Sequence, residues 1–182
     1  LKPAGPNGSV YFTDFDALDA NTDYFAIGHP TFYSVVQQYA SYRNTSGHNA
    51  IGIDVEELYN QFEWGINKHP LAIRKFANWA LGNLTNPKHI FLIGKTIASV
   101  TGRVDPALFE QILVPSFGYP PSDNMITSYL GTDTYLEEPG IAIGRLAAKT
   151  PQQVTDYLQK VQEFEALPNE FWMKKILHFS GG

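Results

Sequence analysis

His89-Ile-Phe-Leu-Ile93, closed by Gly94, is the stretch of sequence that decides the fold. Its apolar residues follow one another without polar interruption, which is typical of a strand buried on both faces of a parallel sheet. Three further runs share this character: Tyr24-Phe-Ala-Ile27, Asn49-Ala-Ile-Gly-Ile53 and Gly140-Ile-Ala-Ile-Gly144. The pattern therefore predicts four core strands.

Segments with apolar residues at helical spacing follow these strands, over residues 32–42, 54–62, 70–80, 105–113 and 150–164. Asp54 with Glu57 has the spacing of a capping box, and Thr150-Pro151 with Gln153 is a second favourable helix start. Apolar strands that alternate with amphipathic helices are typical of a parallel sheet covered on both faces. We predict an α/β protein with three layers, α/β/α, around a mostly parallel, about four-stranded central sheet.

Two weaker strands are predicted near the ends of the sequence. Val10-Tyr-Phe-Thr13 reads as a short edge strand, and a final strand begins at Lys175 and ends before Gly181-Gly182. In open parallel sheets, ligands bind on the loops that follow the carboxyl ends of strands. Because the final strand leads into a glycine turn, we expect the sequence to be the first part of a larger unit.

Composition excludes several classes of function. A length of 182 residues fits one domain with a sizeable core. The net charge is −5 and lysine and arginine are scattered, which argues against nucleic-acid binding. No segment has the apolar length of a membrane span. The absence of cysteine excludes disulfides, thiolate metal sites and a cysteine nucleophile within these residues.

Four polar residues fall at the predicted carboxyl ends of strands: His29, Asp54, Lys95 and Arg145. For Asp54, His29 and Arg145 a structural reading stands beside the functional one. Asp54 is most simply a helix cap, and His29 before a proline reads as a turn residue. Arg145 is suited either to binding a carboxylate or to pairing with a structural acid.

Other candidates lie in the irregular part of the sequence. Oxygen ligands for a hard cation are offered by a group of acidic and amide residues without calcium-loop spacing, Asp123, Asn124, Asp133, Glu137 and Glu138, for which solvated loops are the preferred interpretation. Ser122 has no base at a predictable spacing, and no HExxH, GxSxG, GxGxxG or P-loop motif occurs. From the residues alone we therefore assign no catalytic, cofactor-binding or metal-binding residue.

Several blocks of sequence, taken in order, resemble the N-terminal subdomain of gingipain-like cysteine peptidases, which are relatives of the caspases. The most specific blocks are Asp54-Val-Glu-Glu-Leu-Tyr-Asn-Gln-Phe62 and Ile143-Gly-Arg-Leu146. The others are residues 23–30, 65–66, 72–74, 87–94 and 114–123, and the helix of residues 150–165 with Trp172 and the final strand. The resemblance covers roughly residues 20–182.

The resemblance implies two adjacent α/β subdomains, the second of which carries a catalytic histidine and cysteine that cleave peptide bonds. An acidic residue that orients the histidine would fall just past Gly182, so no catalytic residue is carried over onto this chain. Many relatives have Gly-Asp after the third strand, where this chain has Gly94-Lys95. The family implies no cofactor beyond a structural calcium ion in the parent protein, and it implies export to the surface or surroundings of a Gram-negative bacterium.

We therefore expect residues 1–20 to be a linker or edge segment, 21–171 an α/β subdomain, and 172–182 the first strand of a catalytic subdomain. The preferred function is the non-catalytic subdomain of a secreted cysteine endopeptidase. Its expected partners are the missing catalytic subdomain and the peptide substrates of the parent enzyme. The alternatives are a stand-alone binding module of the same fold and an independent hydrolase that uses Ser122 or another hydroxyl.

Overall fold

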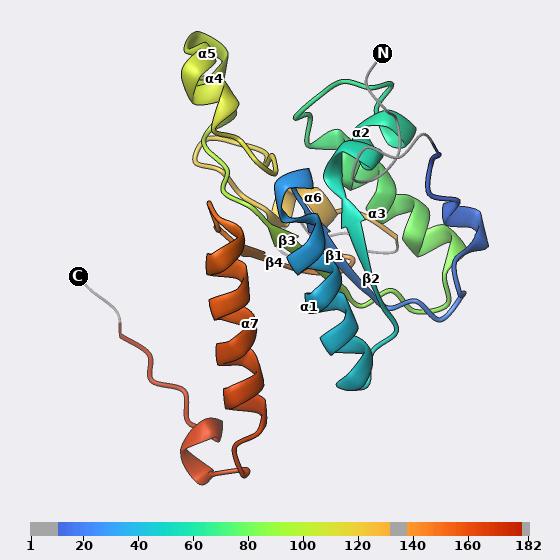
Figure 1. Cartoon of the computed structure of the whole chain (residues 1–182). Helices are drawn as coiled ribbons and strands as arrows, with labels where there is room; N and C mark the ends of the chain where they lie inside the picture. Colours follow the sequence, from blue (N-terminus) through green and yellow to red (C-terminus); the bar gives the residue numbers. More distant parts are fainter. Residues whose placement is uncertain (1–10, 132–137, 180–182) are drawn as a thin grey trace.

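The computed structural model describes residues 11–131 and 138–179, and it confirms the predicted α/β class (Figure 1). Four strands form one sheet: β1 (Tyr24–Gly28), β2 (Ala50–Asp54), β3 (His89–Ile93) and β4 (Ala142–Leu146). All pairings are parallel and the strand order is β2-β1-β3-β4. The central strands β1 and β3 are almost completely buried, as their unbroken apolar sequences predict.

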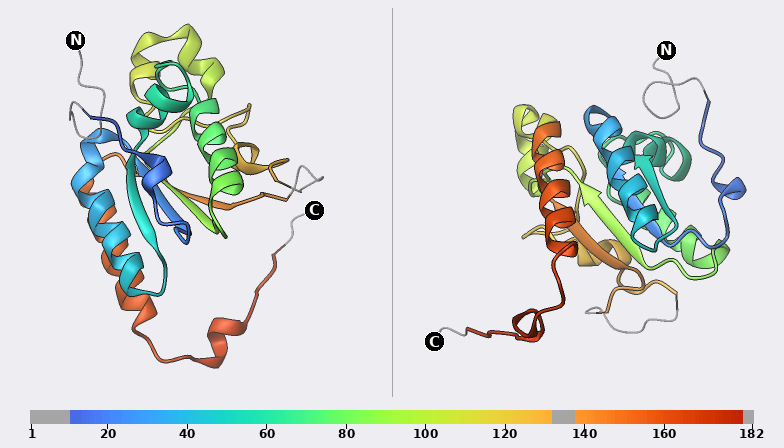
Figure 2. Two further views of the ribbon diagram at one scale, coloured as in Figure 1. Left: turned by 90° about the vertical axis from the view of Figure 1, so that its right-hand side faces the viewer. Right: turned by 60° about the horizontal axis from the view of Figure 1, so that its bottom comes forward.

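Helices cover both faces of the sheet (Figure 2). One face carries α1 (Tyr33–Thr45) and α7 (Pro151–Glu165), and the other carries α2 (Val55–Phe62), α3 (Leu71–Asn83) and α6 (Asn124–Thr127). The remaining helices are short: η2 (Phe15–Ala17), η3 (Pro30–Phe32), α4 (Ser99–Val104), α5 (Pro106–Glu110) and η4 (Phe171–Lys174). None of the described helices is long and apolar enough to cross a membrane.

Each face of the sheet has its own core. Under α2 and α3 the core is rich in aromatic rings, with Phe76 packed against Phe15, Phe25 and Phe62. Under α1 and α7, Tyr39 stacks on Phe91 at a centroid distance of 4.8 Å. Burial of these large side chains is the main force that holds the layers together.

The predicted helix starts are only partly correct. Asp54 caps α2, since its side chain accepts a hydrogen bond of 2.9 Å from the Glu56 N–H. Glu57 does not complete a capping box, because its carboxylate accepts from the Thr13 N–H and from Gln61 Nε2. Thr150 caps α7 as predicted, by accepting from the Gln153 N–H.

Three predicted elements differ in the structure. Residues 11–13 form no strand, and the Thr13 N–H and C=O are bound by the side chains of Glu57 and Gln61; Val10 lies outside the described residues. The fourth strand lies two residues later than predicted, so it includes Arg145. The predicted helix of residues 105–113 is shorter, and α4 precedes it. Of the predicted final strand, residues 175–179 are described, and they pair with no described strand.

The two edges of the sheet differ in whether their outward backbone groups are hydrogen-bonded. The outward N–H and C=O of Ala50 on β2 are both bound by the Asn44 side chain, and the Gly52 carbonyl accepts from Gln37 Nε2. On β4, the register turns the N–H and C=O of Ile143 and Arg145 outward, and no described residue binds them. Side-chain amides thus protect one edge from strand addition, whereas the other edge is open.

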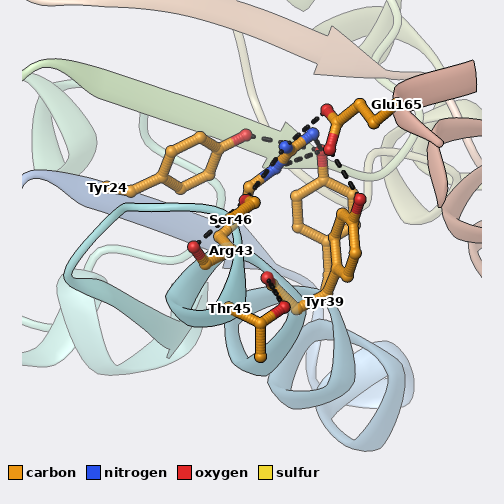
Figure 3. A network of polar contacts seen from close by, with 7 residues as sticks. Tyr24, Tyr39, Arg43, Thr45, Ser46 and Glu165 are labelled. Carbon is orange, nitrogen blue, oxygen red and sulfur yellow. Dashed lines mark hydrogen bonds and ion pairs between the residues drawn. The ribbon is translucent and has the colours of Figure 1, made fainter. Parts of the chain in front are cut away.

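A polar network joins α7 to α1 at the amino ends of the strands (Figure 3). Arg43 Nη1 donates to Glu165 Oε1 at 2.8 Å, and the Tyr42 hydroxyl donates to Glu165 Oε2 at 2.6 Å. Arg43 Nε and Nη2 donate to the Tyr39 hydroxyl, and the Arg43 guanidinium lies over the Tyr39 ring. The network fixes the end of α7 from which the chain continues.

Loss of this ion pair is expected to have a small effect on stability. Glu165→Gln should lower the free energy of unfolding by about 0.2–1 kcal/mol, because the Glu165 side chain is partly exposed and solvent screens its charge. Urea unfolding at neutral pH measures the change. Gln159→Ala, on the same helix, is the control and should change stability less. A loss from Glu165→Gln of several kcal/mol would contradict this view of the network.

Candidate functional site at the carboxyl ends of the strands

The loops that follow the strands enclose a cavity of about 220 Å³. Its walls come from the 67–70 loop before α3, from Thr96 and Ile97 after β3, from Phe109 and Ile112 near α5, and from residues 115–118. Ligands of open parallel sheets bind at this edge. The cavity is therefore the first place to look for a binding site.

Arg145 is the fourth of the five residues of β4, and its side chain holds the loops together. Its Nε and Nη2 bind the Asp123 carboxylate, both at 2.8 Å. Nη1 donates to the carbonyls of Gly94 and Val114 at 2.7 and 2.8 Å, and Nη2 donates to the Pro115 carbonyl at 3.1 Å. These acceptors use all five N–H donors of a guanidinium. Of the two predicted roles for Arg145, the structure confirms pairing with a structural acid.

The charge of Asp123 is stabilised by the same contacts. Partial burial acts to raise the pKa of this carboxyl, but the hydrogen bonds and the positive charge of Arg145 outweigh burial and hold the pKa below its usual value. A carboxylate in a two-point contact with arginine is committed to that contact. Asp123 is therefore a structural acid and not a cation ligand in this arrangement.

The other three candidates also have structural roles. His29 caps η3, where its Nδ1 accepts from the Thr31 N–H at 3.3 Å. Asp54 caps α2, as described above. The Lys95 backbone joins three loops, since its N–H donates to Ala148 and its carbonyl accepts from Leu113 and Val114. Each of these three residues therefore has a structural role at the carboxyl end of a strand, as the sequence predicts.

The predicted oxygen-ligand group does not gather among the described residues. Asp123 is bound to Arg145, and Asn124 is the first residue of α6. Asp133 and Glu137 lie outside the described residues. Within residues 11–131 and 138–179, no group of three or more histidine, aspartate or glutamate side chains is placed to hold a metal ion.

Ser122 lies in a small loop, where its N–H donates to the Phe117 carbonyl at 2.7 Å. Among the described residues, no hydrogen bond joins its side chain to a histidine. The arrangement that a serine hydrolase requires is therefore not built around Ser122 in this part of the chain.

One feature of the cavity was not foreseen from the sequence. His69 lines it, and His69 Nδ1 lies 3.4 Å from Oε1 of Glu63, a buried residue whose other oxygen contacts Lys75. Beside it, Lys68 adopts a left-handed backbone conformation, and its Nζ donates to the carbonyls of Phe109 and Glu110. No local motif marks these residues. They form a wall of loops suited to binding, and among the described residues no hydrogen bond joins His69 Nδ1 to a serine or threonine hydroxyl.

Comparison with known proteins gives one result. The model of peptidase family C25 matches residues 17–182. No curated protein and no solved structure matches the chain significantly. The match covers the sheet, both helical layers and the loops around Arg145, in agreement with the resemblance to gingipain-like peptidases that the sequence blocks indicate. This chain belongs to peptidase family C25, the gingipain family of cysteine peptidases.

Proposed function

We propose that residues 21–171 are the non-catalytic N-terminal subdomain of a gingipain-like cysteine endopeptidase, and that residues 172–182 begin its catalytic subdomain. The observation that carries the proposal is that a member of a cysteine peptidase family has no cysteine in 182 residues. Acyl transfer by this class needs a thiolate assisted by a histidine. The nucleophile must then come from a second subdomain, which we place after Gly182.

The topology supports the assignment of the final segment to another sheet. The β1–α1–β2 crossover and the β4–α7 connection use the same face of the sheet. Since crossovers share one hand, a strand after α7 would have to lie on the β3 side of β4. β3 already occupies that position. The segment that follows α7 is therefore directed out of this sheet.

Exposed apolar side chains support a protein partner for this end of the chain. Phe171 and Trp172 of η4 are exposed, and so is Phe164 at the end of α7. Farther along, Ile176 is 93%, Leu177 79% and Phe179 90% exposed. A concentration of this kind is typical of a surface that another protein covers. We propose that the catalytic subdomain covers it.

The proposed setting follows from the family. Peptidases of the gingipain family are typically extracellular, and we propose that this protein is exported to the surface or surroundings of a Gram-negative bacterium. Its substrates would be proteins and peptides. The role of this subdomain would be to support the catalytic subdomain and to line part of the substrate cleft through the loops around Arg145.

The proposal predicts that the 182-residue chain alone cleaves no peptide bond. Fluorogenic peptides with basic, acidic and apolar residues before the scissile bond should show no turnover above the buffer rate, because no thiolate is present. Ser122→Ala should behave identically. Turnover by the chain that is lost in Ser122→Ala would overturn the proposal in favour of an independent hydrolase.

The native size of the protein separates the proposal from a stand-alone binding module. An immunoblot of the source cells with antibodies to this 20.3 kDa chain should detect a band of twice that mass or more. Mass spectrometry of that band should find a histidine and a cysteine after Gly182. A single band at 20.3 kDa without a larger precursor would instead favour a module that binds ligands at the cavity.

A further inference from the structure

We infer that the open edge of β4 binds an extended strand, and that the 182-residue chain supplies this strand from a second copy of itself. The donor is the segment Lys175–Phe179, and the acceptor is the outer edge of β4 from Ala142 to Leu146. The inference concerns the 182-residue chain by itself; where the chain continues into the catalytic subdomain that we propose, that subdomain takes up the donor segment instead.

The acceptor is a strand edge with unused backbone groups. The register with β3 turns the N–H and C=O of Ile143 and Arg145 outward, where no described residue binds them. Another extended backbone matches the spacing of such groups along the whole strand. The opposite edge differs, because the Asn44 and Gln37 side chains bind the outward N–H and C=O of Ala50 and the Gly52 carbonyl on β2.

The side chains of β4 leave room for the strand. Ala142 and Gly144 are exposed on the face that carries α7, and a Cβ placed on Gly144 would meet no atom within 4 Å. Arg145, the charged residue of the strand, has its guanidinium bound to Asp123 and to loop carbonyls, so it does not repel a neighbour at the edge. The edge therefore lacks the charge that usually blocks strand addition.

The donor has the matching character. Ile176, Leu177 and Phe179 are 79–93% exposed, and the segment pairs with no described strand. Because side chains alternate along a strand, Leu177 and Phe179 lie on one face. Seated on the edge, they would cover the space beside Ala142 and Gly144.

We assign the donor strand to a second copy, because the chain's own segment would reach the outer edge of β4 only through a crossover of the unusual hand. A strand that follows α7 and adds to the outer edge of β4 would make a crossover opposite in hand to β1–α1–β2. A strand from another molecule is not bound by this rule. In a reciprocal exchange, the β4 edge of each copy binds the donor segment of the other, which gives a closed dimer with twofold symmetry.

Light scattering and amide hydrogen exchange test the inference. Raising the concentration from about 10 μM to about 1 mM should double the mass of the chain. In the dimer, the Ile143 and Arg145 amides should exchange at least about tenfold more slowly than in the monomer. The Ala142 and Gly144 amides, which already face β3, should change little.

A pair of matched variants identifies the donor. Leu177→Asp places a charge in the donor strand and should keep the chain monomeric at the higher concentration. Val104→Asp makes the same change on α4, at a side chain that is 80% exposed, and should dimerise like the unmodified chain. Both positions are exposed within one copy, so both variants should fold.

Three outcomes would overturn the inference. The unmodified chain could remain monomeric at the higher concentration. A dimer could form without slower exchange at Ile143 and Arg145, which would indicate a different interface. Slower exchange of these two amides in a monomer would show that the chain closes on itself despite the unfavourable hand.

Discussion

Arg145→Met should lower the free energy of unfolding by about 3–5 kcal/mol, because it removes one partner of a largely buried ion pair. The Arg145 side chain is 9% exposed and that of Asp123 is 22% exposed. Methionine fills much of the same volume but provides no donor. The variant therefore leaves a carboxylate and three loop carbonyls without their hydrogen bonds.

Urea unfolding at neutral pH measures this loss, and two further variants show its origin. Arg145→Lys keeps the charge but not the planar group that binds Asp123 at two points. Its free energy of unfolding should therefore lie between those of the unmodified protein and Arg145→Met. A double-mutant cycle with Asp123→Asn should give a coupling energy of about 0.5–3 kcal/mol. A loss below about 0.5 kcal/mol for Arg145→Met would show that the contacts of Arg145 with Asp123 and the loop carbonyls do not stabilise the fold.

The same pair predicts a loss of stability in acid. The pKa of Asp123 is lower in the folded protein than in the unfolded chain, so the unfolded chain binds more protons as the pH falls. The stabilisation is fully present above the unfolded pKa of about 4 and is lost as the pH falls through the lower folded value. Asp123→Asn should therefore lose less stability than the unmodified protein between about pH 5 and pH 2.

The strands and their parallel arrangement could be predicted because continuous apolar runs leave few alternatives. His89–Ile93 is buried as its sequence indicates. The error in β4 has a physical cause. Arg145 after Gly144 resembles the start of a loop, but its guanidinium is satisfied by Asp123 and by carbonyls, so the strand continues through it.

Other features depend on contacts that no local pattern encodes. α4 begins with Ser99-Val100-Thr101-Gly102, which has low intrinsic helix propensity. Of the strand predicted at residues 10–13, the described residues 11–13 form none, and the Thr13 backbone is bound by Glu57 and Gln61, more than forty positions away. Arg145 and Asp123 are 22 positions apart, so the sequence could offer both roles for the arginine without deciding between them. The cavity wall at His69 likewise depends on tertiary packing.

Phe76→Ala should have a comparably large effect and lower the free energy of unfolding by about 3–5 kcal/mol. Its helical spacing within α3 predicts an inward side chain, and the structure shows what this side chain contacts. The Phe76 ring is fully buried and lies 5.3 Å from the ring centroids of both Phe15 and Phe25. It therefore links the segment before β1, the central strand β1 and α3.

Removal of this ring leaves a cavity in the aromatic core, because three separate elements would have to move together to fill it. Phe171→Ala makes the same chemical change at a side chain that is 76% exposed and should alter stability by less than about 0.5 kcal/mol. Phe76→Leu retains part of the side-chain volume, so its loss of stability should fall between those of Phe76→Ala and Phe171→Ala. Since domains of this size are stable by only about 5–15 kcal/mol, Phe76→Ala should shift the urea midpoint strongly at an unchanged slope. Equal losses from Phe76→Ala and Phe171→Ala would mean that this core does not hold the sheet to its helical layer.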